Sequence, residues 1–137
     1  MSNKKLTVAD IIARKAEREK NNSVLVNVPG LGGEVECKKL GLDRIMSMMD
    51  RYDATEASQS IAFQRELILA ACPLFKDEAL QDAYNVAEPI DIVDLVLDGN
   101  FADYNVLTDA ILAMNGFAET KAEIKNINIS DSTVISS

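Results

Sequence analysis

Three aspartates in the second half of the chain have the spacing of a two-carboxylate site. Asp91 and Asp94 lie three positions apart and Asp94 and Asp98 lie four apart, so all three share one face if the segment is helical. Paired carboxylates can carry general acid–base chemistry. No basic residue or second type of ligand lies near them in the sequence. The pattern therefore favours a solvated helix surface over a catalytic site.

A glycine-rich stretch, NVPGLGGEVECKKL at 27–40, raises the question of phosphate binding. It contains Pro29, Gly30, Gly32 and Gly33. A P-loop needs GxxxxGK[ST] followed by a helix, and a dinucleotide loop needs GxGxxG at the start of a helix. The stretch has neither motif, and a strand-like segment, GEVEC, follows the glycines. We therefore predict that these four residues form the turn of a β-hairpin.

Other chemically active residues are scarce. The chain has no histidine, which removes the commonest general base and the commonest metal ligand. Its two cysteines, Cys37 and Cys72, are too few for a disulfide scaffold or a zinc site and fit a reducing cytoplasm. The segment DGNFAD at 98–103 lacks the alternating oxygen ligands and closing glutamate of a calcium loop. We expect a protein that is not an enzyme, with no catalytic residue, metal or cofactor.

The charge of the chain is negative and unevenly distributed. The net charge is −8 over 137 residues, yet residues 1–21 hold six basic and three acidic side chains. Residues 77–120 hold ten acidic side chains and no basic one. Such a surface repels nucleic acid, and it either keeps the protein soluble or attracts a basic partner. No apolar run approaches the ~18 residues of a membrane span, and the N-terminus lacks the features of a signal peptide.

The first 40 residues predict a helix followed by a hairpin. Thr7 and Asp10 have capping-box spacing, and the helix is expected to run to about Lys20. Its first half has an apolar face, with Val8, Ile11 and Ile12, and is expected to dock on the core. The second half, RKAEREK, is charged all round and is expected to project into solvent. Alternating apolar residues on both sides of the glycine-rich turn predict a β-hairpin over about 23–40.

A methionine-rich segment follows the hairpin. Leu42, Ile45, Met46 and Met49 fall at helical spacing, and Tyr52 extends the same stripe. This spacing predicts that Met46 and Met49 face the core. Met48 falls off the stripe and is the stronger candidate for an exposed contact. Flexible thioethers suit adaptable binding surfaces, so the segment is a candidate partner-binding region.

The rest of the chain predicts four more helices. One ends at Cys72–Pro73, a short one covers about 76–84, an apolar one follows Pro89, and the last ends at Gly116. The fold class is α+β and mainly α: an N-terminal helix, one hairpin, and a bundle of about five helices. We expect a single domain over 1–125, in which 1–21 is a partly projecting helix, and a flexible C-terminal tail over 126–137.

Three stretches together resemble one protein family. They are LTVADIIARK at 6–15, VNVPGLGGEVECKKLGLDR at 26–44, and EPIDIVDLVLDGNFADYNVLTDAILAMNGF at 88–117. Each is short, and their order and spacing carry the likeness. The chain resembles the tail assembly chaperones of tailed phages and prophages, in particular the XkdN-like group of contractile-tailed prophages of Gram-positive bacteria.

This resemblance implies a non-enzymatic protein of the host cytoplasm that is not retained in the mature virion. It implies binding to the tape measure protein, which stays soluble until tail tube subunits polymerise around it. The tail tube protein is a second expected partner, and self-association is left open. The family supplies no contact motif, so our candidate contacts rest on exposure and flexibility: Ile12, Met46, Met48, Met49 and Tyr52. The alternative is a small acidic regulator or nucleic-acid mimic that binds a basic host protein.

Overall fold

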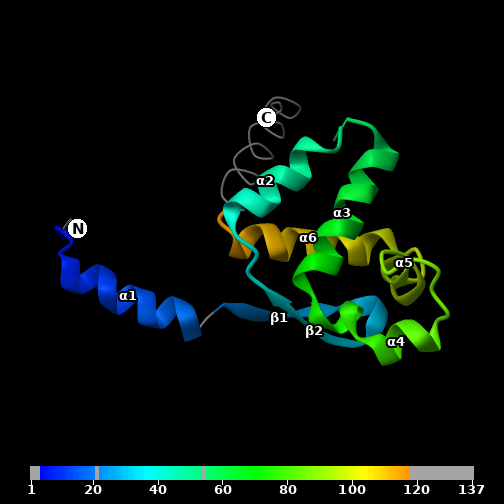
Figure 1. The fold of residues 1–137 in the computed structure, drawn as a ribbon, viewed down its shortest axis with the longest axis horizontal. Helices are drawn as coiled ribbons and strands as arrows, with labels where there is room; N and C mark the ends of the chain where they lie inside the picture. Colours follow the sequence, from blue (N-terminus) through cyan, green and yellow to red (C-terminus); the bar gives the residue numbers. More distant parts are fainter. Residues whose placement is uncertain (1–3, 21, 54, 118–137) are drawn as a thin grey trace, which may run out of the picture.

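The computed structural model describes residues 4–20, 22–53 and 55–117 (Figure 1). It confirms a mainly helical α+β fold with a leading helix, one hairpin and, in the described part, five further helices. Two short 3₁₀ turns, η1 and η2, complete the fold. The C-terminal tail predicted at 126–137 lies outside the described residues. The elements in chain order are α1 Val8–Lys20, β1 Ser23–Val28, η1 Pro29–Leu31, β2 Gly33–Lys38, α2 Leu42–Asp50, α3 Ala57–Ala71, η2 Pro73–Lys76, α4 Glu78–Ala83, α5 Asp91–Leu97 and α6 Phe101–Met114.

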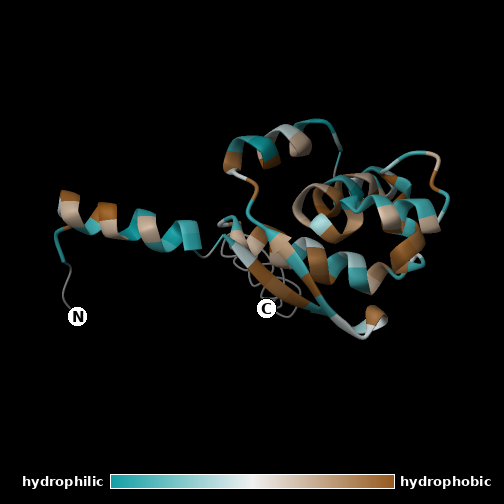
Figure 2. Cartoon of the chain, turned by 60° about the horizontal axis from the view of Figure 1, so that its bottom comes forward, coloured by the Kyte–Doolittle hydropathy of each residue, from teal (hydrophilic) through white to brown (hydrophobic). Residues whose placement is uncertain are grey.

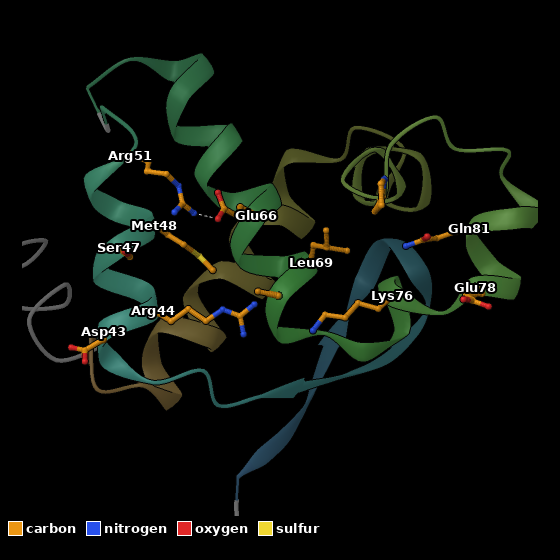
Figure 3. A pocket seen from close by; sticks show the side chains of 12 residues that line it. Asp43, Arg44, Ser47, Met48, Arg51, Glu66, Leu69, Lys76, Glu78 and Gln81 are labelled. Atoms are coloured by element: carbon orange, nitrogen blue, oxygen red, sulfur yellow. Dashed lines mark hydrogen bonds and ion pairs between the residues drawn. The ribbon is translucent and has the colours of Figure 1, made fainter.

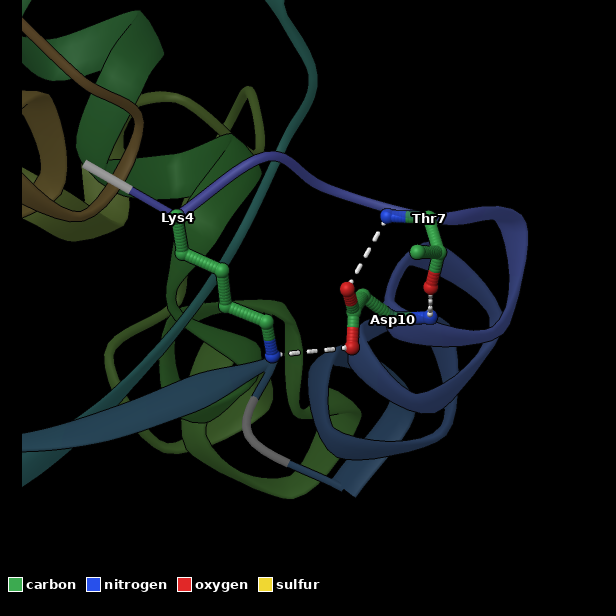
Figure 4. Close-up of polar contacts among 3 residues, drawn as sticks. All are labelled: Lys4, Thr7 and Asp10. Carbon is green, nitrogen blue, oxygen red and sulfur yellow. Dashed lines mark hydrogen bonds and ion pairs between the residues drawn. The ribbon is translucent and has the colours of Figure 1, made fainter.

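Helix α1 begins with the predicted capping box (Figure 4). The Thr7 amide donates to the Asp10 carboxylate at 2.9 Å, and the Asp10 amide donates to the Thr7 hydroxyl at 3.2 Å. Lys4 Nζ lies 3.1 Å from the same carboxylate. The hydrogen bond from the Thr7 amide lowers the pKa of Asp10 most, and the hydrogen bond from Lys4 lowers it further. These local contacts satisfy amide groups that a helix start would otherwise leave to water.

The expectation that the first half of α1 docks on the core is wrong. No residue of α1 is buried within the described chain, and Val8 and Ile12 are 77% and 63% exposed. Figure 1 shows α1 extending away from the remaining helices. Only residues 21 and 22 separate α1 from β1, which leaves little chain with which to fold back. The whole helix therefore projects, with its apolar stripe uncovered.

The hairpin pairs two antiparallel strands, as the alternating pattern predicts. Val24 lies opposite Cys37, and Val26 lies opposite Val35. Val35 and Cys37 are buried, as is Val28 at the end of β1. This apolar face lies over α6 and η2, because β1 contacts α6 and β2 contacts η2. The prediction of a β-hairpin is confirmed, although Val24 on its apolar face is 40% exposed.

The hairpin turn contains Pro29, Gly30 and Gly32, as predicted, whereas Gly33 is the first residue of β2 and pairs with Val28. Residues Pro29–Leu31 form the single 3₁₀ turn η1, and Gly32 closes it with a left-handed φ of 69°. The turn also contacts α6, because the Gly30 amide donates to Asp103 Oδ1 at 3.3 Å. Asp103 is only 2% exposed, so this bond joins the hairpin tip to a buried carboxylate.

Helix α2 corrects the assignment of the methionines. Met48, predicted to be exposed, is 3% exposed, while Met46, predicted to face the core, is 48% exposed. Ile45 and Met48 are the buried residues of α2, and Met49 packs partly against them. The helix packs mainly on α3. The face that meets α3 is rotated from the predicted stripe of Leu42, Ile45, Met46 and Met49.

Helices α3 and α6 pack against each other at the centre of the core. Leu67 and Ile68 of α3 and Leu107 and Ile111 of α6 are fully buried. The Thr108 hydroxyl donates to Gln64 Oε1 at 3.1 Å, which satisfies two polar side chains inside this interface. The side chain of Asn100 caps the start of α6. The helix ends at Met114, and Gly116, the residue predicted to end it, adopts a positive φ of 89°.

Candidate partner-binding surfaces

The aspartates of α5 make structural contacts. Asp94 lies 2.8 Å from Arg65 of α3 and accepts a hydrogen bond from the Tyr104 hydroxyl of α6. Asp91 accepts from the Glu88 amide at 3.2 Å. The hydrogen bond to Asp94 raises the pKa of Arg65. The pKa of Tyr104 is raised mainly by burial and, to a smaller extent, by its hydrogen bond to Asp94. Asp94 therefore joins α5 to α3 and α6. Its partner Arg65 lies 29 residues away in the chain, so the local sequence could not reveal it.

The two cysteines form a buried thiol pair. Their Sγ atoms lie 3.4 Å apart at hydrogen-bonding distance, and both side chains are buried and form no disulfide. The hydrogen bond with Cys37, together with burial, raises the pKa of Cys72. A buried and protonated thiol is a poor nucleophile. Both cysteines are therefore core residues.

No group of three or more histidine, cysteine or acidic side chains is placed to hold a metal ion among the described residues. Within the same residues, no helix is long and apolar enough to cross a membrane.

Helix α1 presents the first candidate surface, which we call the α1 stripe: Leu6, Val8, Ile11 and Ile12. All four side chains are more than half exposed. Figure 2 shows the apolar residues of α1 concentrated toward its N-terminal half, followed by hydrophilic residues. A row of adjacent apolar residues on a helix that has no buried residue in the described chain is an unusual exposure for a globular domain. Ile12, one of the predicted contacts, lies in this stripe.

The second candidate surface is an open pocket of about 770 Å³, which we call the α2–η2 groove. Its apolar floor consists of Met48 from α2 and Leu69 from α3, both labelled in Figure 3, together with Ala70 from α3. Charged side chains surround this floor. Its remaining lining residues are Asp43, Arg44, Ser47, Arg51, Glu66, Lys76, Glu78, Gln81 and Pro89.

The groove contains three cations, of which one is ion-paired and two are not ion-paired within the described residues. Arg51 forms an ion pair with Glu66. Arg44 and Lys76 make neither an ion pair nor a hydrogen bond with any residue in the part of the chain that the structure describes. Figure 3 shows both head groups pointing into the groove from opposite sides, while Asp43 and Glu78 lie toward its outer edges. The groove thus combines an apolar floor with two cations that have no ion-pair partner among the described residues.

The structure does not bring the predicted contact residues together. Ile12 lies on α1, Met46 is exposed on α2, and Met48 lies in the floor of the groove. Met49 is half-buried against the core. Tyr52 donates to Glu66 at 2.8 Å, so its hydroxyl is already engaged.

Sequence reasoning missed Arg44, Leu69 and Lys76. Each is an ordinary residue in its local segment, and only the packing of α2 and η2 against α3 places them around one groove.

Comparison with known proteins gave one match. A family model described as phage XkdN-like tail assembly chaperone protein matches residues 14–128. Searches of curated proteins and of solved structures returned no match.

Proposed function

The chain belongs to the XkdN-like family of phage tail assembly chaperones, and on this basis we propose that it binds the tape measure protein of its phage. In this proposal it keeps that protein soluble and is released as tail tube subunits polymerise around it. The protein acts in the cytoplasm of the bacterial host, catalyses no reaction, and is absent from the mature virion. The tail tube protein is its second partner, because it competes for the same bound segment.

The α1 stripe is the observation that supports this proposal most directly. A chaperone for a long helical protein needs apolar contacts that are available before the partner arrives. Such contacts are provided by Val8, Ile11 and Ile12, which are exposed on a helix with no buried residue in the described chain. Met46 adds a flexible apolar side chain on the outer side of α2.

Release requires that each contact be weak. The stripe contains four apolar side chains on about two helical turns, so it covers far less area than the ~1,600 Å² of a typical stable interface. Many chaperone copies on one long partner, each held weakly, can dissociate one at a time as the tube grows. This arrangement couples release to polymerisation without any chemical step.

The test is co-expression with the tape measure protein of the same phage genome, followed by measurement of soluble and co-purified tape measure protein. The wild-type chain is expected to raise the soluble fraction, and Ile11→Ser with Ile12→Ser is expected to abolish that effect. The matched control is Leu95→Ser with Phe101→Ser, which removes two exposed apolar residues from α5 and α6. Failure of the wild-type chain to associate would exclude the proposed function.

The same experiment tests the acidic regulator. That alternative needs the acidic residues of 77–120 to face a basic partner. Asp94 is already paired with Arg65, and Asp103 is buried, so these two residues of the acidic run are not available to a partner. Capture of a basic host protein that dissociates as salt rises, in place of the tape measure protein, would favour the regulator.

A further inference from the structure

We infer that the α2–η2 groove receives an amphipathic helix of the partner, which places an apolar side chain on the floor and a carboxylate between Arg44 and Lys76. This inference rests on the proposed function, because it takes the tape measure protein as that partner. It adds a second contact site, distinct from the α1 stripe, and it specifies the chemistry of the segment that binds there.

The two cations are the first argument. The chain contains 22 acidic and 14 basic residues, so acidic partners for Arg44 and Lys76 are plentiful. Asp43 and Glu78 are in the same groove, yet neither forms an ion pair with these cations among the described residues. Two like charges from separate elements that point into one groove repel each other until an anion arrives. A carboxylate between them would gain charge-assisted hydrogen bonds from both sides.

The floor is the second argument. Met48, Leu69 and Ala70 line the same groove as the two cations and are its apolar part, and the thioether of the largely buried Met48 is a flexible part of this lining. The groove volume of about 770 Å³ suits insertion of one or two side chains from a helix. On a helix, an apolar residue and an acidic residue three or four positions apart lie side by side. Such a pair matches the floor and the cations together.

Charge argues against other occupants. The second half of α1 carries four basic residues against Glu17 and Glu19, so the α1 helix of a second copy would bring a net positive charge toward the two cations. A nucleic acid would meet Asp43, Glu66 and Glu78 around the groove and a net charge of −8. An acidic, apolar helix is the occupant that satisfies both the floor and the cations.

The test uses fluorescein-labelled peptides of about 20 residues, the length of a helix of about 30 Å, that tile the tape measure protein. Their binding to the full chain is followed by fluorescence anisotropy. The variant is Arg44→Glu with Lys76→Glu. The matched control is Arg14→Glu with Lys39→Glu, which changes the net charge equally but alters a separate pair of cations near the end of α1. Urea unfolding of all three proteins verifies that each is folded.

We expect the groove variant to bind at least one acidic, apolar peptide roughly tenfold more weakly than the wild type, as for the loss of a charge-assisted contact, while the control binds it as the wild type does. Replacement of the acidic residue of that peptide by lysine is expected to restore binding to the groove variant. Equal weakening of the groove variant and the control would overturn the inference, because net charge alone would then account for the effect.

The inference and the proposed function fail in different ways. If both variants bind every peptide as the wild type does, the groove is not a contact site, and the chaperone function stands on the α1 stripe. If the wild-type chain binds neither peptides nor the intact tape measure protein, the proposed function fails and the inference fails with it.

Discussion

Replacement of Gly30 by alanine should destabilise the fold through one close approach. A Cβ atom built on Gly30 would lie 1.9 Å from Asp103 Oδ2 and 2.9 Å from Asn100 Nδ2. Either the turn moves away from α6, or Asp103 rotates and loses the bond from the Gly30 amide. Because Asp103 is buried, the second outcome leaves a carboxylate without that partner. Overpacking and an unsatisfied buried group each cost about 1–3 kcal/mol, so we expect a loss in this range.

Urea unfolding followed by circular dichroism measures this loss. With a slope of about 2 kcal/mol per molar urea, a loss of 2 kcal/mol lowers the midpoint by about 1 M. Gly33→Ala is the matched control, because a Cβ at Gly33 meets nothing within 4 Å, and its unfolding free energy should change by less than about 0.5 kcal/mol. In an Asp103→Ala background, Gly30→Ala should cost less, since the nearest clash is gone. Equal midpoints for Gly30→Ala and Gly33→Ala would refute the reasoning.

Three further predictions follow from burial and hydrogen bonding. Met48→Ala should lower the unfolding free energy by about 2–5 kcal/mol and Met46→Ala by less than about 1 kcal/mol, and similar losses on urea unfolding would contradict the assigned rotation of α2. The carboxyl ¹³C resonance of Asp10 should titrate with a midpoint below 3.8, because hydrogen bonds stabilise its charged form. The stabilisation that this carboxylate gives the first turn of α1 is therefore fully present above pH 3.8 and is lost as the pH falls through the lowered pKa. A titration midpoint at or above pH 3.8 would exclude the capping box in solution. Cys37 and Cys72 should react with Ellman's reagent only after unfolding in urea, and rapid reaction of the native protein would show that the pair is accessible.

The features predicted correctly from the sequence are those fixed by neighbours a few residues away. The capping box of α1 needs only Thr7 and Asp10, three positions apart. The hairpin needs an alternating pattern on each side of a turn, and Gly32 provides the left-handed residue that closes it. The end of α6 needs only the positive φ of Gly116. The resemblance to tail assembly chaperones also depended on the order of such local patterns, and the family match confirms it.

The incorrect predictions concern the face that each helix buries. Apolar spacing placed Met46 in the core and Met48 at the surface, but both faces of α2 carry apolar residues. The packing of α2 on α3 selects between them, and it buries Met48. Similarly, the apolar half of α1 was expected to dock, but none of its residues is buried in the described chain.

The sequence by itself therefore determined the elements, the turn and the family, because capping, alternation and turn chemistry act over a few residues. Only the tertiary structure decided what those elements build together. It brings Arg65 to Asp94, Cys37 to Cys72 and Gly30 to Asp103 across separations of 29 to 73 residues. It also places Arg44 and Lys76 around one groove. Such contacts depend on the rotation and packing of whole helices, which no local pattern specifies.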